Sequence, residues 1–144
     1  MRLVSTVIYV DDVVRTIGFY EAAFGCGVKF LDADVRMPGR IDGQVYQFAE
    51  LDVAGATLQF GTHALGALLM PGFERPSGGG PSGVEIAFYT DDVPGAFARA
   101  VAAGATPLRA PETMPWGQEV AYVRSLEGTF IGLCAPIGEP ADPS

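Results

Sequence analysis

Two stretches decide the fold: residues 84–93 read VEIAFYTDDV, and residues 4–13 read VSTVIYVDDV. Tyr9 and Asp12 of the first stretch recur 80 positions later as Tyr89 and Asp92. In each copy an apolar run of strand length is followed by Asp-Asp and then by apolar residues at helical spacing. The repeat predicts a tandem duplication of a strand–helix unit.

The ends of both helices can be placed from the same repeat. Asp12 and Asp92 stand where an N-cap carboxylate accepts hydrogen bonds from the free amide groups of a helix. A glycine follows each helical pattern, Gly25 in the first copy and Gly104 in the second, and glycine commonly ends a helix. Each helix is therefore bounded by its own sequence signals.

Around each helix the chain predicts a module of order βαβββ, and hence an α+β fold. We expect two curved mixed sheets with the helices on their convex sides. The expected strands of the first module, residues 1–63, are 3–10, 27–31, 44–51 and 55–62, with a helix at 12–24. Those of the second, residues 83–136, are 83–90, 106–109, 117–124 and 128–135, with a helix at 92–103. A Gly/Pro-rich linker is predicted at 64–82 and a mobile tail at 137–144.

Composition and charge limit the kinds of binding partner and the cellular location that the chain can have. The 144 residues carry a net charge of −8 at pH 7, which argues against nucleic acid and anionic membranes. No apolar run approaches the ~20 residues needed to span a bilayer, and the N-terminal residues enter a strand directly rather than a signal peptide. We therefore expect a cytoplasmic protein. Cys26 and Cys134 show no metal-ligating spacing, and both are expected to be free thiols.

Strand alternation sorts the two faces of each sheet. Leu58, Phe60, Ile131 and Leu133 form a uniformly apolar set, which is expected to lie beneath the helices. The other face mixes aromatic, amide, carboxyl and very small side chains, a combination that suits the binding of an organic molecule. The predicted ligand-binding residues are Tyr9, Gln47, Gln59, His63, Glu85, Tyr89, Trp116, Gln118, Tyr122 and Phe130.

Three of these residues have a functional and a structural interpretation. Glu85 is either a ligand anchor or general base, or a partner hydrogen-bonded to Gln59 or Gln118. Trp116 is either a stacking wall for a planar ligand or a cap on the end of the sheet. His63 lacks a nearby acidic residue in the sequence that would orient it, which favours a hydrogen-bonding role at a loop end over a catalytic base.

Several motifs carry a resemblance to a known family. The Tyr-Val-Asp-Asp motif, FY at 19–20 with FG at 24–25, WGQ at 116–118, YVR at 122–124 and EG at 127–128 resemble the vicinal oxygen chelate superfamily. That superfamily includes glyoxalase I, extradiol dioxygenases and bleomycin-resistance proteins. The resemblance covers about residues 3–136 and is closest in character to the metal-free, drug-binding resistance branch.

The resemblance also implies four metal-binding positions. In the enzymes of the superfamily, His, Gln or Glu hold a divalent ion at the positions that match Ser5, Gln59, Glu85 and Gly132 here. A catalytic divalent site needs about three protein donors. Gly132 has no side chain and Ser5 offers only a neutral hydroxyl, so we expect no metal and no other cofactor.

Two functions of different class follow. The first is a metal-independent small-molecule-binding protein of the bleomycin-resistance type, which sequesters a planar aromatic or cationic compound. The alternative is an enzyme, a divergent glyoxalase-like lyase, isomerase or dioxygenase that uses Glu85 or a non-standard metal site. We expect binding rather than catalysis. We also expect a homodimer, because a single four-stranded sheet leaves one face open and similar proteins dimerise.

Overall fold

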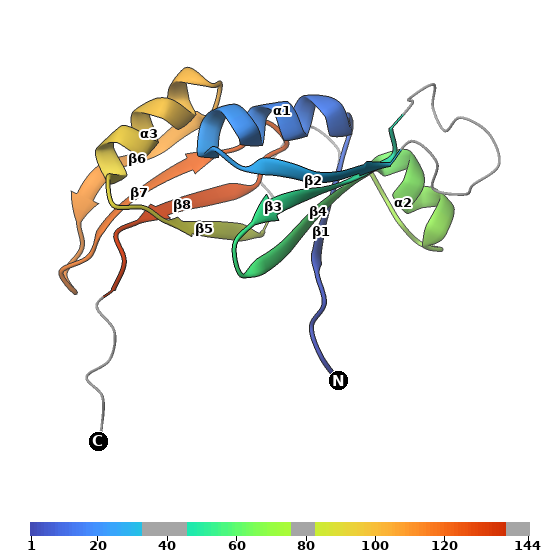
Figure 1. The fold of residues 1–144 in the computed structure, drawn as a ribbon, viewed down its shortest axis with the longest axis horizontal. Helices are drawn as coiled ribbons and strands as arrows, with labels where there is room; N and C mark the ends of the chain where they lie inside the picture. The colour runs from blue at the N-terminus through green and yellow to red at the C-terminus, as the bar shows by residue number, and fades with distance from the viewer. Residues whose placement is uncertain (33–45, 76–82, 138–144) are drawn as a thin grey trace. The chain divides into compact units, whose positions relative to one another are not determined.

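The computed structural model describes residues 1–32, 46–75 and 83–137. The chain divides into two compact units, residues 1–80 and 81–144, and each is built on a four-stranded mixed sheet with helices (Figure 1). The predicted α+β fold of two tandem βαβββ modules is confirmed. The predicted mobile tail lies outside the described residues from residue 138 onward.

The first unit contains the expected strands and helix in the expected order. Its elements are β1 (Thr6–Val10), α1 (Val13–Phe24), β2 (Gly27–Asp32), β3 (Phe48–Val53), β4 (Ala56–Thr62) and α2 (His63–Leu69). The sheet order is β1-β4-β3-β2. The strands β1 and β4 run parallel, and the other neighbours are antiparallel.

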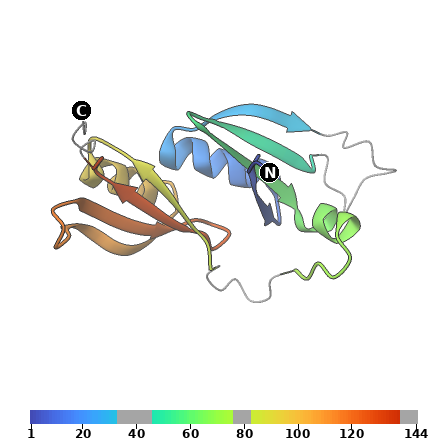
Figure 2. The same ribbon diagram turned by 90° about the horizontal axis from the view of Figure 1, so that it is seen from below.

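The second unit repeats this topology (Figure 2). Its elements are β5 (Glu85–Tyr89), α3 (Val93–Ala102), β6 (Thr106–Thr113), β7 (Glu119–Arg124) and β8 (Phe130–Cys134). The sheet order is β5-β8-β7-β6, with β5 and β8 parallel. The two sheets have the same strand order, as a tandem duplication requires.

The repeated Asp-Asp pairs start the helices as expected. Asp12 Oδ1 accepts from the amide of Arg15 at 3.1 Å, and Asp92 Oδ1 accepts from the amide of Gly95 at 3.0 Å. The C-cap of α1 is Gly25, with φ of 70°, a left-handed conformation that glycine adopts without a steric penalty. Local sequence signals thus fix where these helices begin and end.

The apolar set of each sheet lies where alternation predicted. Leu58 and Phe60 are buried in the first unit, and Ile131 and Leu133 are buried in the second. The ring of Tyr20, on α1, lies 4.9 Å from that of Phe60. In the second unit α3 packs on β6, β7 and β8. The face of each sheet opposite these helices is where the candidate site must be sought.

One segment departs from the prediction. The first part of the predicted linker at 64–82 folds as helix α2, while its residues 76–82 lie outside the described part of the chain. The hydroxyl of Thr62 accepts from the amide of Leu65 at 3.0 Å and caps the helix, and the Leu65 side chain is buried. The Gly/Pro-rich composition that predicts a linker belongs to residues 76–82, whereas a buried apolar residue and a cap stabilise the helix at residues 63–69.

The strand β6 is longer than the predicted 106–109 and continues to Thr113. It includes Pro107 and Pro111. β6 lies at the edge of its sheet, where a residue without an N–H does not interrupt a ladder on both sides.

None of the helices in the described ranges is long and apolar enough to cross a membrane.

Candidate functional site

The strand register brings four of the predicted ligand-binding residues onto one face of the second sheet, opposite α3. Glu85 pairs with Phe130, Tyr89 pairs with Cys134, and Tyr122 pairs with Gly132. Register partners point to the same side of a sheet. We call this surface the Glu85 face; its members are Glu85, Ala87, Tyr89, Tyr122, Phe130, Gly132 and Cys134.

The small side chains of this face make room for the Glu85 carboxylate. A Cβ atom added to Gly132 would lie 2.6 Å from Glu85 Oε1, 3.4 Å from a ring carbon of Tyr122 and 3.5 Å from the Cβ of Ala87. The carboxylate of Glu85 therefore reaches across from β5 and lies over β8, in space that any side chain at position 132 would take. We call Glu85, Ala87, Tyr122, Gly132 and Cys134 the Glu85 cluster.

The two other polar groups of the cluster are neutral at physiological pH. Burial raises the pKa of the Tyr122 phenol, and the negative charge of Glu85 raises it further. Burial also raises the pKa of the Cys134 thiol, again with a contribution from Glu85. The cluster thus offers one carboxyl group beside a protonated hydroxyl and a protonated thiol, which are hydrogen-bond donors rather than anions.

The environment of Cys134 gives a direct test of this arrangement. In a Cys26→Ser background, Cys134 is expected to react with iodoacetamide at pH 8 more slowly than a free cysteine, because only the thiolate is nucleophilic. Glu85→Gln removes the nearby charge and should lower the pKa of the thiol and speed the reaction. Glu119→Gln, on β7, is the matched control. Equal rates for Glu85→Gln and the parent would place the carboxylate away from Cys134.

Trp116 lies at the turn between β6 and β7, and its ring is held although it is 65% exposed. Its indole Nε1 donates to Gln118 Oε1 at 2.9 Å, and Gln118 Nε2 donates to the carbonyl of Ala135 at 2.7 Å. An exposed tryptophan fixed in this way is suited to stack on a planar molecule. Gln118 acts on the orientation of Trp116 through this chain of hydrogen bonds.

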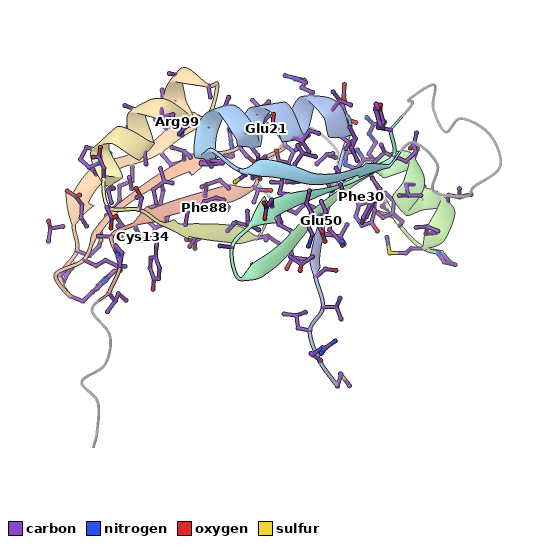
Figure 3. The ribbon with its side chains drawn as sticks, viewed as in Figure 1. Glu21, Phe30, Glu50, Phe88, Arg99 and Cys134 are labelled. Carbon is purple, nitrogen blue, oxygen red and sulfur yellow. The ribbon has the colours of Figure 1, made fainter. Side chains whose placement is uncertain are left out.

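One other aromatic side chain, that of Tyr89, lies toward the same end of the sheet as Trp116, whereas Phe130 lies at the other end. Tyr89, the last residue of β5, is 68% exposed and is in register with Cys134, the last residue of β8. Figure 3 shows Cys134 at the end of the sheet that carries the β6–β7 turn. Phe130 lies at the opposite end of β8, beside Glu85, and is partly buried.

In the first unit Gln59 belongs to a polar network that the sequence did not reveal. Its Nε2 donates to Glu50 Oε1 at 3.0 Å, and Glu50 Oε2 lies 3.4 Å from Lys29 Nζ. Phe30 is in register with Glu50 on the same face and is 47% exposed (Figure 3). Gln59 is thus hydrogen-bonded to Glu50 within the first unit, and Gln118 to Ala135 within the second.

Tyr9 and Gln47 are placed differently from the residues of the Glu85 face. The ring of Tyr9 packs edge-on against Phe73 at a centroid distance of 5.2 Å and covers Gly61, whose added Cβ would lie 2.9 Å from it. Gln47 is only 4% exposed, and its Oε1 accepts from the Thr62 hydroxyl at 2.6 Å. Both side chains are engaged in the packing of the first unit.

His63 has the acidic partner that the sequence seemed to lack. Its Nδ1 lies 3.1 Å from Asp11 Oδ1, and Asp11 also forms an ion pair with Arg75. Asp11 follows β1 and His63 follows β4, and these strands are parallel neighbours, so their C-terminal ends meet. The Asp-Asp pair was the sequence signal for this contact, because Asp12 alone caps helix α1 and Asp11 remains available for another partner.

Burial of the imidazole lowers the pKa of His63, and a hydrogen bond to the backbone of Tyr9 opposes this only in part. A lowered folded-state pKa means that the unfolded chain binds more protons, so the free energy of unfolding should fall as pH drops below about 6.5. His63 is the single histidine of the chain. His63→Gln should therefore flatten the pH dependence of urea unfolding between pH 7 and 5. Stability that instead rises on acidification would mean that Asp11 holds the imidazole protonated.

Comparison with known proteins agrees with this architecture. The model of the Glyoxalase/Bleomycin resistance protein/Dioxygenase superfamily matches residues 2–133. The match covers most of the chain, and the chain belongs to this superfamily. No curated protein sequence matches the chain significantly.

Solved structures share the fold at low sequence identity. A glyoxalase-related enzyme from Fulvimarina pelagi has a TM-score of 0.72 and 18% identity, over 96% of this chain and 94% of that one. TioX from Micromonospora sp. ML1 has a TM-score of 0.68 and 20% sequence identity, over 95% of this chain and 100% of that one. A glyoxalase/bleomycin resistance protein/dioxygenase family enzyme from Burkholderia phytofirmans PsJN has a TM-score of 0.69 and 23% sequence identity, over 95% of this chain and 100% of that one.

The family's metal positions do not fit a divalent ion in this chain. Gly132 supplies no donor, and the Glu85 carboxylate already lies in the space of a side chain there. The amide of Gln59 is bonded to Glu50, and Ser5 precedes β1 with only a neutral hydroxyl. Within residues 1–32, 46–75 and 83–137, no group of three or more His, Cys, Asp or Glu side chains could hold a metal.

Proposed function

We propose that this protein is a metal-independent small-molecule-binding protein that sequesters a planar aromatic or cationic compound on the Glu85 face. The observation that carries the proposal is the position of Glu85, whose carboxylate lies over Gly132 next to the neutral donors Tyr122 and Cys134. A carboxylate presented in this way attracts an ammonium or another basic group through a charge-assisted hydrogen bond.

The aromatic side chains support the proposal that the ligand is planar and aromatic. Trp116 and Tyr89 are well exposed, and Trp116 is held in one orientation by Gln118. Exposed aromatic rings fixed by hydrogen bonds offer contact area without a large loss of side-chain entropy on binding. Gly132 and Ala87 supply the space between the charged group and the rings.

The alternative function is catalysis with Glu85 as a general base. One observation favours it: the Tyr122 phenol, kept protonated by burial and by Glu85, is a candidate general acid beside a candidate base. This function predicts turnover that is lost in both Glu85→Gln and Tyr122→Phe. The binding function predicts that Tyr122→Phe still binds ligand and that no product forms.

The test of the proposed function is a calorimetric titration with benzylamine and larger planar aromatic amines. Glu85→Gln should weaken binding of these cations, because a neutral hydrogen bond replaces a charge-assisted one. Trp116→Ala should weaken the binding free energy by about 0.5–1.5 kcal/mol beyond the effect of lost buried area, because ring stacking is lost. Trp116→Phe keeps an aromatic ring and should retain part of this stacking energy. Glu21→Gln on α1 makes the same charge change in the first unit and is the control.

Two results would contradict the proposal. Affinity that is indifferent to both Glu85→Gln and Trp116→Ala would place the ligand elsewhere. Stoichiometric nickel, zinc or iron in the purified protein, whose removal abolishes binding, would contradict metal independence. Because Trp116 is the only tryptophan, its fluorescence reports directly whether a ligand reaches the β6–β7 turn.

We also propose that the protein is a cytoplasmic homodimer. Cys26 and Cys134 form no disulfide within the described residues, which suits a reducing compartment. Phe30 is 47% exposed on a sheet face of the first unit, and a second copy would cover it. Sedimentation at micromolar concentration should give twice the 15.1 kDa chain mass, and a monomer there would reject this.

A further inference from the structure

Arg109 is one of two basic residues that the register places on the Glu85 face; the other, Arg124, pairs with Phe130. Arg109 lies on β6 and pairs with Tyr122 on β7, which in turn pairs with Gly132 on β8. Partners of adjacent strands project from the same side of a regular sheet, and the pairing of Arg109 with Tyr122 lies between two irregularities in the register of β6 with β7. Arg109, Tyr122 and Gly132 therefore form one row across the Glu85 face, with the Glu85 carboxylate over one end of it.

The guanidinium of Arg109 forms a weak ion pair at the surface of the second unit. Its Nη1 donates to Glu112 Oε2 at 3.3 Å, and both side chains are more than half exposed. Exposed ion pairs three residues apart contribute little to stability. Arginine has five N–H donors in a planar fork that matches a carboxylate, so a ligand carboxylate can share or replace Glu112.

We infer that Glu85 and Arg109 are two opposite anchors of one site, and that its ligand is a dipolar aromatic molecule with a basic group toward Glu85 and an acidic group toward Arg109. The inference rests on the proposed function and specifies its ligand class. The phenol of Tyr122 lies between the anchors and donates a hydrogen bond to the ligand. The influence of both charges on the phenol supports the placement, since Glu85 raises the pKa of Tyr122 and Arg109 lowers it.

The spacing of the anchors sets the size of the ligand. The Glu85 carboxylate lies over β8, and two strand spacings separate β8 from β6, about 10 Å in total. The long arginine side chain shortens this gap for the charged groups themselves. A single aromatic ring with an ammonium on one side and a carboxylate on the other, such as 4-(aminomethyl)benzoate, spans such a distance.

The experiment compares 4-(aminomethyl)benzoate with benzylamine, which lacks the carboxylate, by calorimetry. The parent protein should prefer the dipolar compound by about fivefold, the upper range for a partly exposed charge pair. Arg109→Met should abolish this preference, so that the two compounds bind with equal affinity. Arg99→Met, on α3 at the other face of the sheet (Figure 3), removes the same charge and should change neither affinity.

A further variant makes the assignment specific. Arg124 also lies on this side of the sheet, in register with Phe130, and Arg124→Met should keep the preference for the dipolar compound. Loss of the preference in Arg124→Met rather than Arg109→Met would overturn the role of Arg109. Equal binding of the two compounds by the parent would overturn the inference while leaving the proposed function intact. No binding of either compound would overturn both.

Discussion

Replacing Phe60 by alanine is expected to lower the free energy of unfolding by about 3–5 kcal/mol, the usual cost of removing a fully buried phenylalanine. Phe60 is 0% exposed, and its ring packs beneath Tyr20 of α1. The substitution removes apolar contact area and leaves a cavity that a tightly packed interior refills only in part. Urea unfolding followed by circular dichroism measures the change.

Phe30 offers a matched control in the same sheet. It pairs with Glu50, which pairs with Gln59, so it lies on the face opposite Phe60. Because it is partly exposed, Phe30→Ala should cost about 1 kcal/mol or less. Similar losses for the two variants would show that α1 does not cover the face that carries Phe60.

The second large effect is expected on ligand binding in Gly132→Val. The new side chain would occupy the space of the Glu85 carboxylate, since its Cβ alone would lie 2.6 Å from Glu85 Oε1. Displacing this carboxylate removes a charge-assisted hydrogen bond of about 1.5–3 kcal/mol. The affinity for benzylamine should therefore fall roughly tenfold or more. Gly132→Ala should give a smaller loss, because only one methyl group enters.

The effect should come from the site and not from misfolding. Gly132 is not among the glycines with a left-handed backbone, and valine is favourable in strands. Gly83→Val is the control, because an added Cβ there meets nothing within 4 Å. A folded Gly132→Val protein that binds benzylamine as tightly as the parent would show that the ligand does not use the Glu85 cluster.

Most of the fold follows from local signals in the sequence. The repeated Asp-Asp pairs start both α1 and α3, and Gly25 ends α1, because capping depends on a few neighbouring residues. Period-two alternation sorted Phe60 and Leu133 to the helix face and Glu85 to the other face. At residues 64–70 the sequence indicates only a short apolar turn against the core, because the burial of Leu65 that stabilises helix α2 is not revealed by its short local pattern.

The sequence by itself determined the duplicated βαβββ plan, the two faces of each sheet and the position of Glu85 on the face opposite α3. Only the tertiary structure decided which side chains meet: Asp11 with His63, Glu50 with Gln59, and the Glu85 carboxylate with the open space at Gly132. Arg109 joined the candidate site only through the register of β6 with β7. The physical reason is that alternation fixes the direction of a side chain, whereas its partner depends on strand register and rotamer, which residues distant in sequence set together.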